Sequence, residues 1–259
     1  MFMPNLDIVD MLLQAERDGV TIQPISASYP LGLDEAYRIQ QAVIEKKLAS
    51  DPEGRWIGLK AGLTSRAKQK MVNIDEPILG QLLSSNVVNG PALNLDGLNQ
   101  PRVEPEVAFY FAKEATGREE SEEELLDAIG YAFPALEILD SRFQNYKFQI
   151  QDVVADNAST ARVVFGEGAF SPDREKLGCM NVSLLINGEV VESGATAAVL
   201  GHPLTSALWV ARKWASMGRT IPAGSILMTG GITTAVPISR GDVVVGRYEG
   251  WGEISFHCI

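Results

Sequence analysis

The sequence predicts an α+β fold in which helices come first along the chain and strands dominate later. Apolar residues recur at helical spacing in the segments 5–18 and 33–49, whereas strand-like runs dominate beyond residue 80. The 259 residues suffice for one large domain or for a small domain followed by a large one. We expect two domains, 1–80 and 81–259, although no linker rich in Pro or Ser marks the boundary.

The bulk composition is that of a soluble globular protein, with 46% apolar and 21% charged residues. A formal net charge of −11 argues against nucleic acid and anionic membrane surfaces as partners. No apolar run is long enough to span a bilayer, and the segment 1–7 lacks the features of a signal peptide. Cys179 and Cys258 are far apart without metal-ligand spacing, so we expect buried, reduced thiols and a cytoplasmic location.

The first sixty or so residues after the N-terminus contain two helices and then a strand. The helix at 5–18 is followed by Gly19, where a C-terminal cap belongs. The helix at 33–49 carries lysines near its end, as the helix dipole favours. The segment 56–65 predicts a buried strand that ends in a glycine-bearing bend, and a short helix is expected at 66–71.

Further along, the acidic run at 119–124 predicts a solvated helix start, where Ser121 and Glu124 have the form of a capping box, and this helix is expected to extend to Ile129. The segment 141–170 is polar and rich in Asn, and we expect an ordered, functional loop. An Asn-Gly turn makes 181–193 a hairpin. A helix is expected from about residue 203 to 217.

The central stretch is the expected strand 102–111. Its apolar side chains fall on odd positions, so Glu104 and Glu106 project together from the opposite face. A third acid, Glu137, lies in another strand-like run at 133–140. Such a cluster suits either a solvated sheet edge or a hard cation such as Mg²⁺ or Mn²⁺, and the spacing alone favours neither.

Several polar residues elsewhere are candidates for the same site. Lys60 sits inside an apolar run, where its ammonium either reaches the surface or points into an anionic pocket, and the three acids favour the pocket. Asp156, Asn157 and Ser159 are candidates for lining a pocket, with local turn chemistry as the alternative. A Gly-Gly turn beginning at Gly230 could offer backbone N–H groups to an anion.

Four motifs together resemble the hydratase and decarboxylase branch of the fumarylacetoacetase superfamily over nearly the whole chain. They are the run 58–65, the three glutamates 104, 106 and 137, the run 154–159, and the Leu-Gly-His-Pro run at 200–203. The resemblance implies an α+β fumarylacetoacetase-like fold, with a small N-terminal α/β part and a larger β-rich, mixed-sheet C-terminal part that holds the site.

The resemblance also implies roles for individual residues. It implies Mg²⁺, with Mn²⁺ as a possible substitute, held by Glu104, Glu106 and Glu137, and it implies Lys60 and Asp156 as catalytic residues. Six residues are then expected to bind the substrate: Leu59, Arg142, Asn157, Ser159, Thr229 and Gly230. The implied partners are a small 2-oxo dicarboxylic acid, further copies of the chain and a partner hydratase, with neither nucleic acid nor membrane.

The implied activity is metal-dependent decarboxylation of (3E)-2-oxohex-3-enedioate to 2-hydroxypenta-2,4-dienoate, a step in the meta-cleavage degradation of aromatic compounds. The runs 139–142 and 229–233 resemble decarboxylases more than hydratases. Hydration of 2-hydroxypenta-2,4-dienoate is the main alternative. A C–C hydrolase lacks its base, because no histidine precedes His202, which is expected to be structural. A non-catalytic partner subunit is the remaining alternative.

Overall fold

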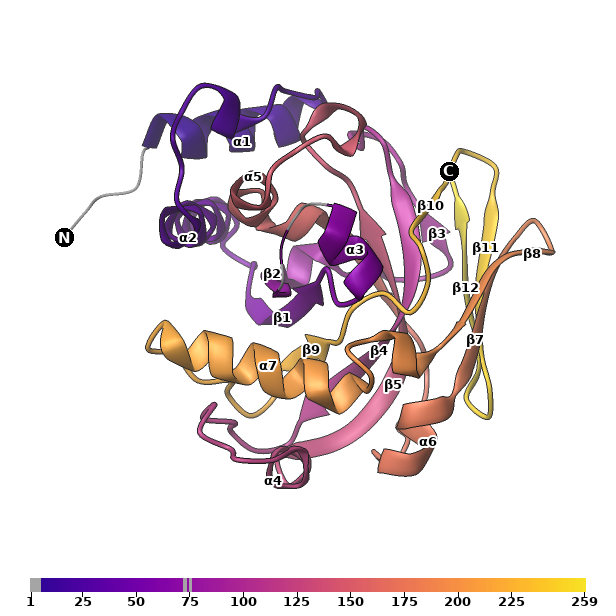
Figure 1. Cartoon of the computed structure of the whole chain (residues 1–259). Helices are drawn as coiled ribbons and strands as arrows, with labels where there is room; N and C mark the ends of the chain where they lie inside the picture. Colours follow the sequence, from indigo (N-terminus) through magenta and orange to yellow (C-terminus); the bar gives the residue numbers. More distant parts are fainter. Residues whose placement is uncertain (1–5, 72–73, 75) are drawn as a thin grey trace.

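The computed structural model describes residues 6–71, 74 and 76–259 (Figure 1). Position 5 of the first predicted helix, and most of the segment considered as a signal peptide, lie outside this part of the chain. The described chain contains both helices and strands, and the strands form two mixed sheets, which confirms the predicted α+β class. None of its helices has the length and apolar character needed to cross a membrane.

Two long helices open the described chain. α1 (Leu6–Asp18) buries an apolar stripe that includes Leu12. α2 (Leu33–Ser50) lies beside the large sheet and α5, as Figure 1 shows. The Gln40 side-chain amide of α2 donates hydrogen bonds to the carbonyl oxygens of Leu79 at 3.0 Å and Val154 at 2.9 Å. These bonds satisfy buried backbone carbonyls and hold the helix against the sheet that carries the site.

The large sheet has seven strands and includes all the elements that carry the predicted metal ligands. Its strands run in the order β2-β1-β9-β4-β5-β6, with β10 paired to β4. β1 and β9 are parallel, and the remaining pairs are antiparallel. The strands are β1 (Trp56–Gly62), β2 (Ile78–Leu83), β4 (Arg102–Phe111), β5 (Ile129–Leu139), β6 (Thr160–Phe165), β9 (Ile226–Met228) and β10 (Val236–Pro237).

A second sheet of five strands stands beside β4 and β5 (Figure 1). Its order is β3-β12-β11-β7-β8. The predicted hairpin is confirmed, because Asn187 and Gly188 connect β7 to β8 with φ values of 54° and 85°. The strands are β3 (Ala92–Leu93), β7 (Asn181–Ile186), β8 (Glu189–Ala195), β11 (Val243–Tyr248) and β12 (Gly252–Cys258).

Five further helices connect these strands: α3 (Arg66–Met71), α4 (Glu122–Leu126), α5 (Ile150–Ala155), α6 (Arg174–Cys179) and α7 (Pro203–Ser216). Ser121 caps α4 as predicted, because its side chain accepts a hydrogen bond from the Glu124 backbone N–H. The Glu124 carboxylate accepts from the Glu120 N–H and not from that of Ser121, so the reciprocal half of the predicted capping box is replaced. His202 is structural, as predicted, and caps α7 by accepting from the Leu204 N–H at 3.0 Å.

Three expectations differ from the structure. The segment 141–170 is not one loop: it contains α5 and β6, because its scattered apolar residues bury themselves on these elements. Ile129 begins β5 and does not belong to the preceding helix. Cys179 is exposed, since it is the last residue of α6, whereas Cys258 is buried as expected.

The two predicted domains share the large sheet. β1 and β2 come from the first 80 residues or just beyond, and β1 pairs with β9 from the last third of the chain. One apolar cluster extends from Ile8 of α1 to Cys258 of β12. The division into 1–80 and 81–259 therefore stays a prediction.

Candidate metal centre and substrate cavity

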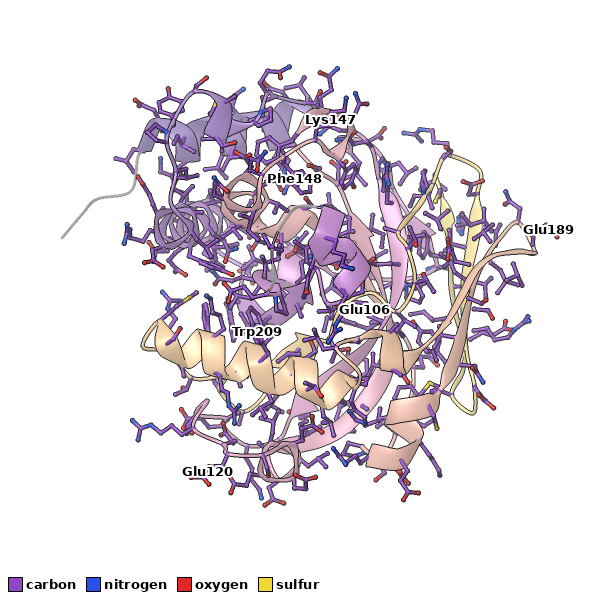
Figure 2. The ribbon with its side chains drawn as sticks, viewed as in Figure 1. Glu106, Glu120, Lys147, Phe148, Glu189 and Trp209 are labelled. Carbon is purple, nitrogen blue, oxygen red and sulfur yellow. The ribbon has the colours of Figure 1, made fainter. Side chains whose placement is uncertain are left out.

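Three glutamates converge between two paired strands. Glu104 and Glu106 share one face of β4, and the β4–β5 register places Glu137 directly opposite Glu104. One carboxylate oxygen from each of the three lies within 4.8 Å of the others. Figure 2 shows Glu106 in the interior, whereas Glu120 and Glu189 stand on the outside. The predicted convergence is confirmed, and the role of the three as metal ligands stays a prediction.

Burial makes this cluster electrostatically costly. Glu106 and Glu137 have no exposed surface, and Glu104 is 6% exposed. Burial, reinforced by the charges of Glu137 and Glu104, raises the pKa of Glu106 well above its usual value. Burial also raises the pKa of Glu137, although the neighbouring charge of Lys60 opposes this effect. A bound dication would favour the ionised form of all three carboxylates.

The backbone around β9 shapes the cluster. The N–H of Gly230 donates to Oε2 of Glu106 at 2.7 Å, which holds that carboxylate in place. A Cβ atom at Gly231 would lie 2.2 Å from Cδ of Glu104, so only glycine leaves room for this carboxylate. Within the described part of the chain, the buried Oε1 of Glu106 has no hydrogen-bond partner. An unsatisfied buried carboxylate oxygen in an all-oxygen donor set fits a hard cation.

Lys60 supplies the positive charge of the site. Its side chain is 2% exposed, and its ammonium nitrogen lies 3.0 Å from Oε1 and 3.3 Å from Oε2 of Glu137. The same ammonium donates to the carbonyl oxygen of Ala158 at 2.7 Å. Gly80 faces Lys60 across the β1–β2 pair, and a Cβ there would lie 3.0 Å from Cε of Lys60. The expectation of an ammonium in an anionic pocket is confirmed.

A tyrosine from the five-stranded sheet supports the cluster from behind. The hydroxyl of Tyr248 on β11 donates to the Ala135 carbonyl oxygen at 2.6 Å and accepts from the Glu106 N–H at 3.2 Å. Burial, together with the charge of Glu106, raises the pKa of Tyr248, so the hydroxyl remains a donor. The second sheet thereby fixes the position of β4 at the glutamates.

A cavity of about 200 Å³ opens over these groups. Lys60, Glu104 and Ser159 line it, together with Arg102 and Tyr146. The remaining wall is mostly apolar and comprises Gly62, Leu63, Ile78, Leu139, Phe148, Val153, Ala158, Thr234 and Ala235. A small organic acid with a hydrocarbon middle suits such a wall, because polar groups are concentrated at a few points.

The predicted substrate-binding residues differ in their placement. Ser159 lines the cavity, whereas Gly230 is not among the lining residues and its N–H donates to Glu106. Asn157 exchanges two hydrogen bonds with the Gln81 backbone, at 2.8 and 2.9 Å. The Thr229 hydroxyl donates to the Val107 carbonyl at 3.0 Å, and Leu59 is a fully buried core residue. For these last three residues the contacts are structural, and their predicted roles stay predictions.

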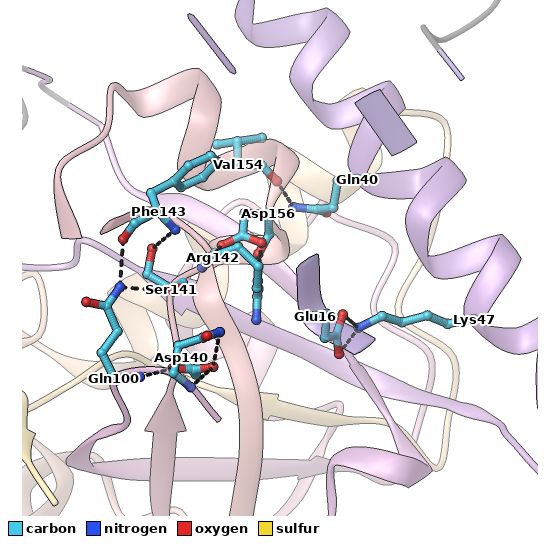
Figure 3. A network of polar contacts seen from close by, with 12 residues as sticks. Glu16, Gln40, Lys47, Gln100, Asp140, Ser141, Arg142, Phe143, Val154 and Asp156 are labelled. Carbon is cyan, nitrogen blue, oxygen red and sulfur yellow. Dashed lines mark hydrogen bonds and ion pairs between the residues drawn. The ribbon is translucent and has the colours of Figure 1, made fainter. Parts of the chain in front are cut away.

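Arg142 and Asp156 form a separate buried pair (Figure 3). Nε of Arg142 donates to Oδ1 of Asp156, and its Nη2 donates to the Asp156 carbonyl oxygen at 2.8 Å. Neither residue is among those lining the cavity; Arg142 instead borders a polar cleft beside the Glu16–Lys47 ion pair. The structure thus separates this pair from the three glutamates, and the predicted catalytic role of Asp156 stays a prediction.

Arg102 and Tyr146 of the cavity wall carry no role in the sequence prediction. Arg102 lies two residues before Glu104, so strand alternation places it on the same face as the acids. That signal was available in the sequence. Tyr146 reaches the cavity from the strained turn after Phe143, and no local pattern indicates this.

Comparison with known proteins identifies the family. Residues 63–258 match the family described as "Fumarylacetoacetate (FAA) hydrolase C-terminal". The chain belongs to the fumarylacetoacetate hydrolase family. A 4-oxalocrotonate decarboxylase of Pseudomonas putida is 36% identical over 252 residues, which cover 96% of this chain and 95% of the relative. A 2-keto-4-pentenoate hydratase of Paraburkholderia xenovorans is 33% identical over 245 residues, which cover 94% and 90%.

Solved structures of the family share the fold. The 4-oxalocrotonate decarboxylase from Pseudomonas putida G7, complexed with magnesium and adipate, superposes with a TM-score of 0.93 at 36% identity, covering 98% of this chain and 97% of that chain. A fumarylpyruvate hydrolase from Pseudomonas aeruginosa, with a TM-score of 0.64 at 13% identity, covers 79% of this chain and 89% of that chain, and shares the fold alone. The predicted fumarylacetoacetase-like fold is confirmed.

Proposed function

We propose that this protein is a carboxy-lyase that decarboxylates 4-oxalocrotonate, (3E)-2-oxohex-3-enedioate, to 2-hydroxypenta-2,4-dienoate and CO₂. The observation that carries the proposal is the buried set of three glutamates with Lys60 at the base of a small, mostly apolar cavity. Two relatives at 36% and 37% identity are named 4-oxalocrotonate decarboxylase, which supports this choice of substrate.

Glu104, Glu106 and Glu137 would hold Mg²⁺, or Mn²⁺ in its place. The donor set fits, because it offers only carboxylate oxygens and includes buried oxygens of Glu106 and Glu137 without a hydrogen-bond partner among the described residues. A relative of known structure contains magnesium, which supports the same metal here. When bound, the dication supplies Lewis acidity that stabilises negative charge on the 2-oxo oxygen.

The reaction breaks the bond to the distal carboxylate, and CO₂ leaves. The remaining electron pair moves through the double bond to the 2-oxo group, where a proton completes the 2-hydroxy product. Lys60 holds a positive charge beside this region and offers N–H protons, so it balances the developing negative charge and is our candidate proton donor. The apolar wall excludes water, which strengthens these interactions.

Product analysis tests the proposal. Purified protein with (3E)-2-oxohex-3-enedioate and Mg²⁺ should release one CO₂ per 2-hydroxypenta-2,4-dienoate formed. EDTA should abolish the release, and added Mg²⁺ or Mn²⁺ should restore it. Turnover that is unchanged by the chelator would contradict the metal-dependent reaction.

Hydration of 2-hydroxypenta-2,4-dienoate is the second candidate. Hydratases among the relatives reach 33–35% identity, a range only slightly below that of the decarboxylases. Supplying each substrate separately distinguishes the two, because only the decarboxylase releases CO₂ and only the hydratase forms 4-hydroxy-2-oxopentanoate. A C–C hydrolase has less support, since no histidine is among the residues that line the cavity.

We also propose a cytoplasmic homo-oligomer that associates with the hydratase consuming its product. The sister activities of the relatives support such a pairing. Light scattering of the protein alone, and then mixed with a hydratase relative, tests both assemblies. Monomeric mass in the first measurement, or two separate species in the second, would contradict the corresponding proposal.

A further inference from the structure

We propose that Arg102 binds the distal carboxylate of the substrate, with the ring of Tyr146 as its support, and so selects dicarboxylic over monocarboxylic 2-oxo acids. The inference rests on the proposed function, because it assumes that the 2-oxo end of the substrate lies at the three glutamates. It adds to that function the residue that recognises the distal carboxylate of the substrate.

Strand geometry places Arg102 within reach of the ligand. Arg102 and Glu104 point to the same face of β4, and two residues along a strand span about 6.6 Å. Both line the same cavity, and the side chains between and around them are mostly apolar. A short hydrocarbon chain with one acidic group near Glu104 would therefore carry its second acidic group toward Arg102.

Tyr146 orients the guanidinium. The Cζ atom of Arg102 lies 4.4 Å from the centre of the Tyr146 ring. Tyr146 has a positive φ of 55°, which is unfavourable for a residue with a large side chain, and it follows Asn145 with a φ of 56°. This strained backbone places the ring against Arg102. Strained residues of this kind cluster at binding sites, where they position a side chain for a ligand. Stacking occupies the flat face of the guanidinium and leaves its N–H edges available for a planar carboxylate.

The charge of Arg102 is not neutralised by the described residues. Within residues 6–71, 74 and 76–259, Arg102 makes no ion pair. At the cavity its guanidinium contacts the ring of Tyr146. The other arginine considered for this role, Arg142, is bonded to Asp156 outside the cavity. Arg102 is therefore the arginine of the cavity wall that is available to an anion.

The second carboxylate of a dicarboxylic substrate calls for this cation. A 2-oxo monocarboxylate would add one negative charge to the site, and a dicarboxylate would add two. Arg102 offsets the second one, which a wall of apolar side chains would otherwise leave unpaired at a cost.

A pair of matched ligands tests the inference directly. 2-Oxohexanedioate and 2-oxohexanoate share the 2-oxo acid end and differ in the distal carboxylate, and neither has the double bond needed for turnover. Calorimetric titration in saturating Mg²⁺ should show at least about tenfold tighter binding of the dicarboxylate by the wild-type protein, which corresponds to about 1.4 kcal/mol. Arg102→Met should remove this preference and leave the affinity for 2-oxohexanoate within about twofold of the wild-type value.

Further variants separate charge from geometry. Arg102→Lys should keep only part of the preference, because an ammonium lacks the planar fork. Tyr146→Phe should keep the stacking and the preference, whereas Tyr146→Leu should weaken it. Arg247→Met is the matched control, since Arg247 lies on the exposed face of β11 and pairs with Glu253.

The outcomes distinguish the inference from the proposed function. Retention of the dicarboxylate preference in a folded Arg102→Met variant, or equal affinities in the wild-type protein, would overturn the role of Arg102 and leave the 2-oxo acid site standing. Failure of the wild-type protein to bind either ligand in Mg²⁺ would instead contradict the proposed function. In steady-state assays the substitution should raise KM for the natural dicarboxylate at least tenfold.

Discussion

Glu104 and Glu137 lie directly opposite each other on β4 and β5, and both side chains are buried. Like charges at opposed positions of an antiparallel pair destabilise the sheet. Lys60 offsets one of these charges at 3.0 Å, and Glu106 adds another on the same face. Among the described residues, the fold thus gathers three buried carboxylates and one ammonium on one face, and this arrangement supports the proposed metal site.

Glu106→Gln should abolish metal-dependent stabilisation while leaving the fold intact. Gln is close in shape to protonated Glu, and the pKa of Glu106 is raised by burial and by Glu137 and Glu104, so the metal-free protein tolerates the neutral side chain. In thermal melts with and without Mg²⁺, the wild-type Tm should rise with Mg²⁺ and the variant Tm should not. CO₂ release should fall about 100-fold or more.

The control for this measurement is Glu253→Gln. Glu253 is exposed and pairs with Arg247, so its replacement should change neither the Mg²⁺ response nor turnover. An unaltered Mg²⁺ response in Glu106→Gln would mean that the metal does not bind at the three glutamates.

Gly231→Ala should weaken metal binding through the position of Glu104. The new methyl group would lie 2.2 Å from Cδ of Glu104, so the carboxylate has to move. We expect about tenfold or more loss of Mg²⁺ affinity in calorimetric titration. Gly32→Ala is the matched control, because a Cβ there meets nothing within 4 Å. Equal Mg²⁺ affinity in both variants would show that the present position of Glu104 is not needed for the metal.

Local patterns predicted most of the elements, because the causes lie within a few residues. Two-residue alternation placed Glu104 and Glu106 on one face, and the Asn187–Gly188 turn and the Ser121 cap depend on neighbours in sequence. The pairing of Glu104 with Glu137 was expected only as convergence. Register between distant strands depends on the whole sheet, and the local sequence does not determine it.

The separation of Arg142 and Asp156 from the site could not be predicted for the same reason. Both lie in runs that looked functional, yet they satisfy each other's charge at a place determined by how α5 packs on α2. Arg102, in contrast, follows the same alternation as the acids, so its place on that face could be predicted from the strand pattern. The alternation of a strand applies to every side chain on the face, whatever its charge.

Asp156→Asn distinguishes a structural from a catalytic role. The substitution gives Arg142 a neutral amide in place of its carboxylate acceptor, so we expect a loss of about 1–3 kcal/mol in the free energy of unfolding. If the role is structural, kcat of the folded fraction should change less than about threefold. Asp96→Asn, at an exposed pair with Arg240, should cost at most about 1 kcal/mol. A large fall in kcat with wild-type stability would instead support the catalytic role.

Asp156 should also make the free energy of unfolding depend on pH. Burial raises the pKa of Asp156 to about 6, because desolvation outweighs the neighbouring charge of Arg142. A carboxyl group with a raised pKa binds its proton more tightly in the folded state, so its contribution is fully present below the unfolded value of about 3.9 and is lost as pH rises through about 6.

Denaturant unfolding between pH 4 and pH 7 should show this contribution, worth roughly 3 kcal/mol for the rise in pKa. The difference in unfolding free energy between wild type and Asp156→Asn should change with pH across this window and become constant above about pH 7. Asp96→Asn, at an exposed ion pair, is the control variant in the same measurement. A constant difference for Asp156→Asn would mean that Asp156 stays ionised throughout and that Arg142 dominates its environment.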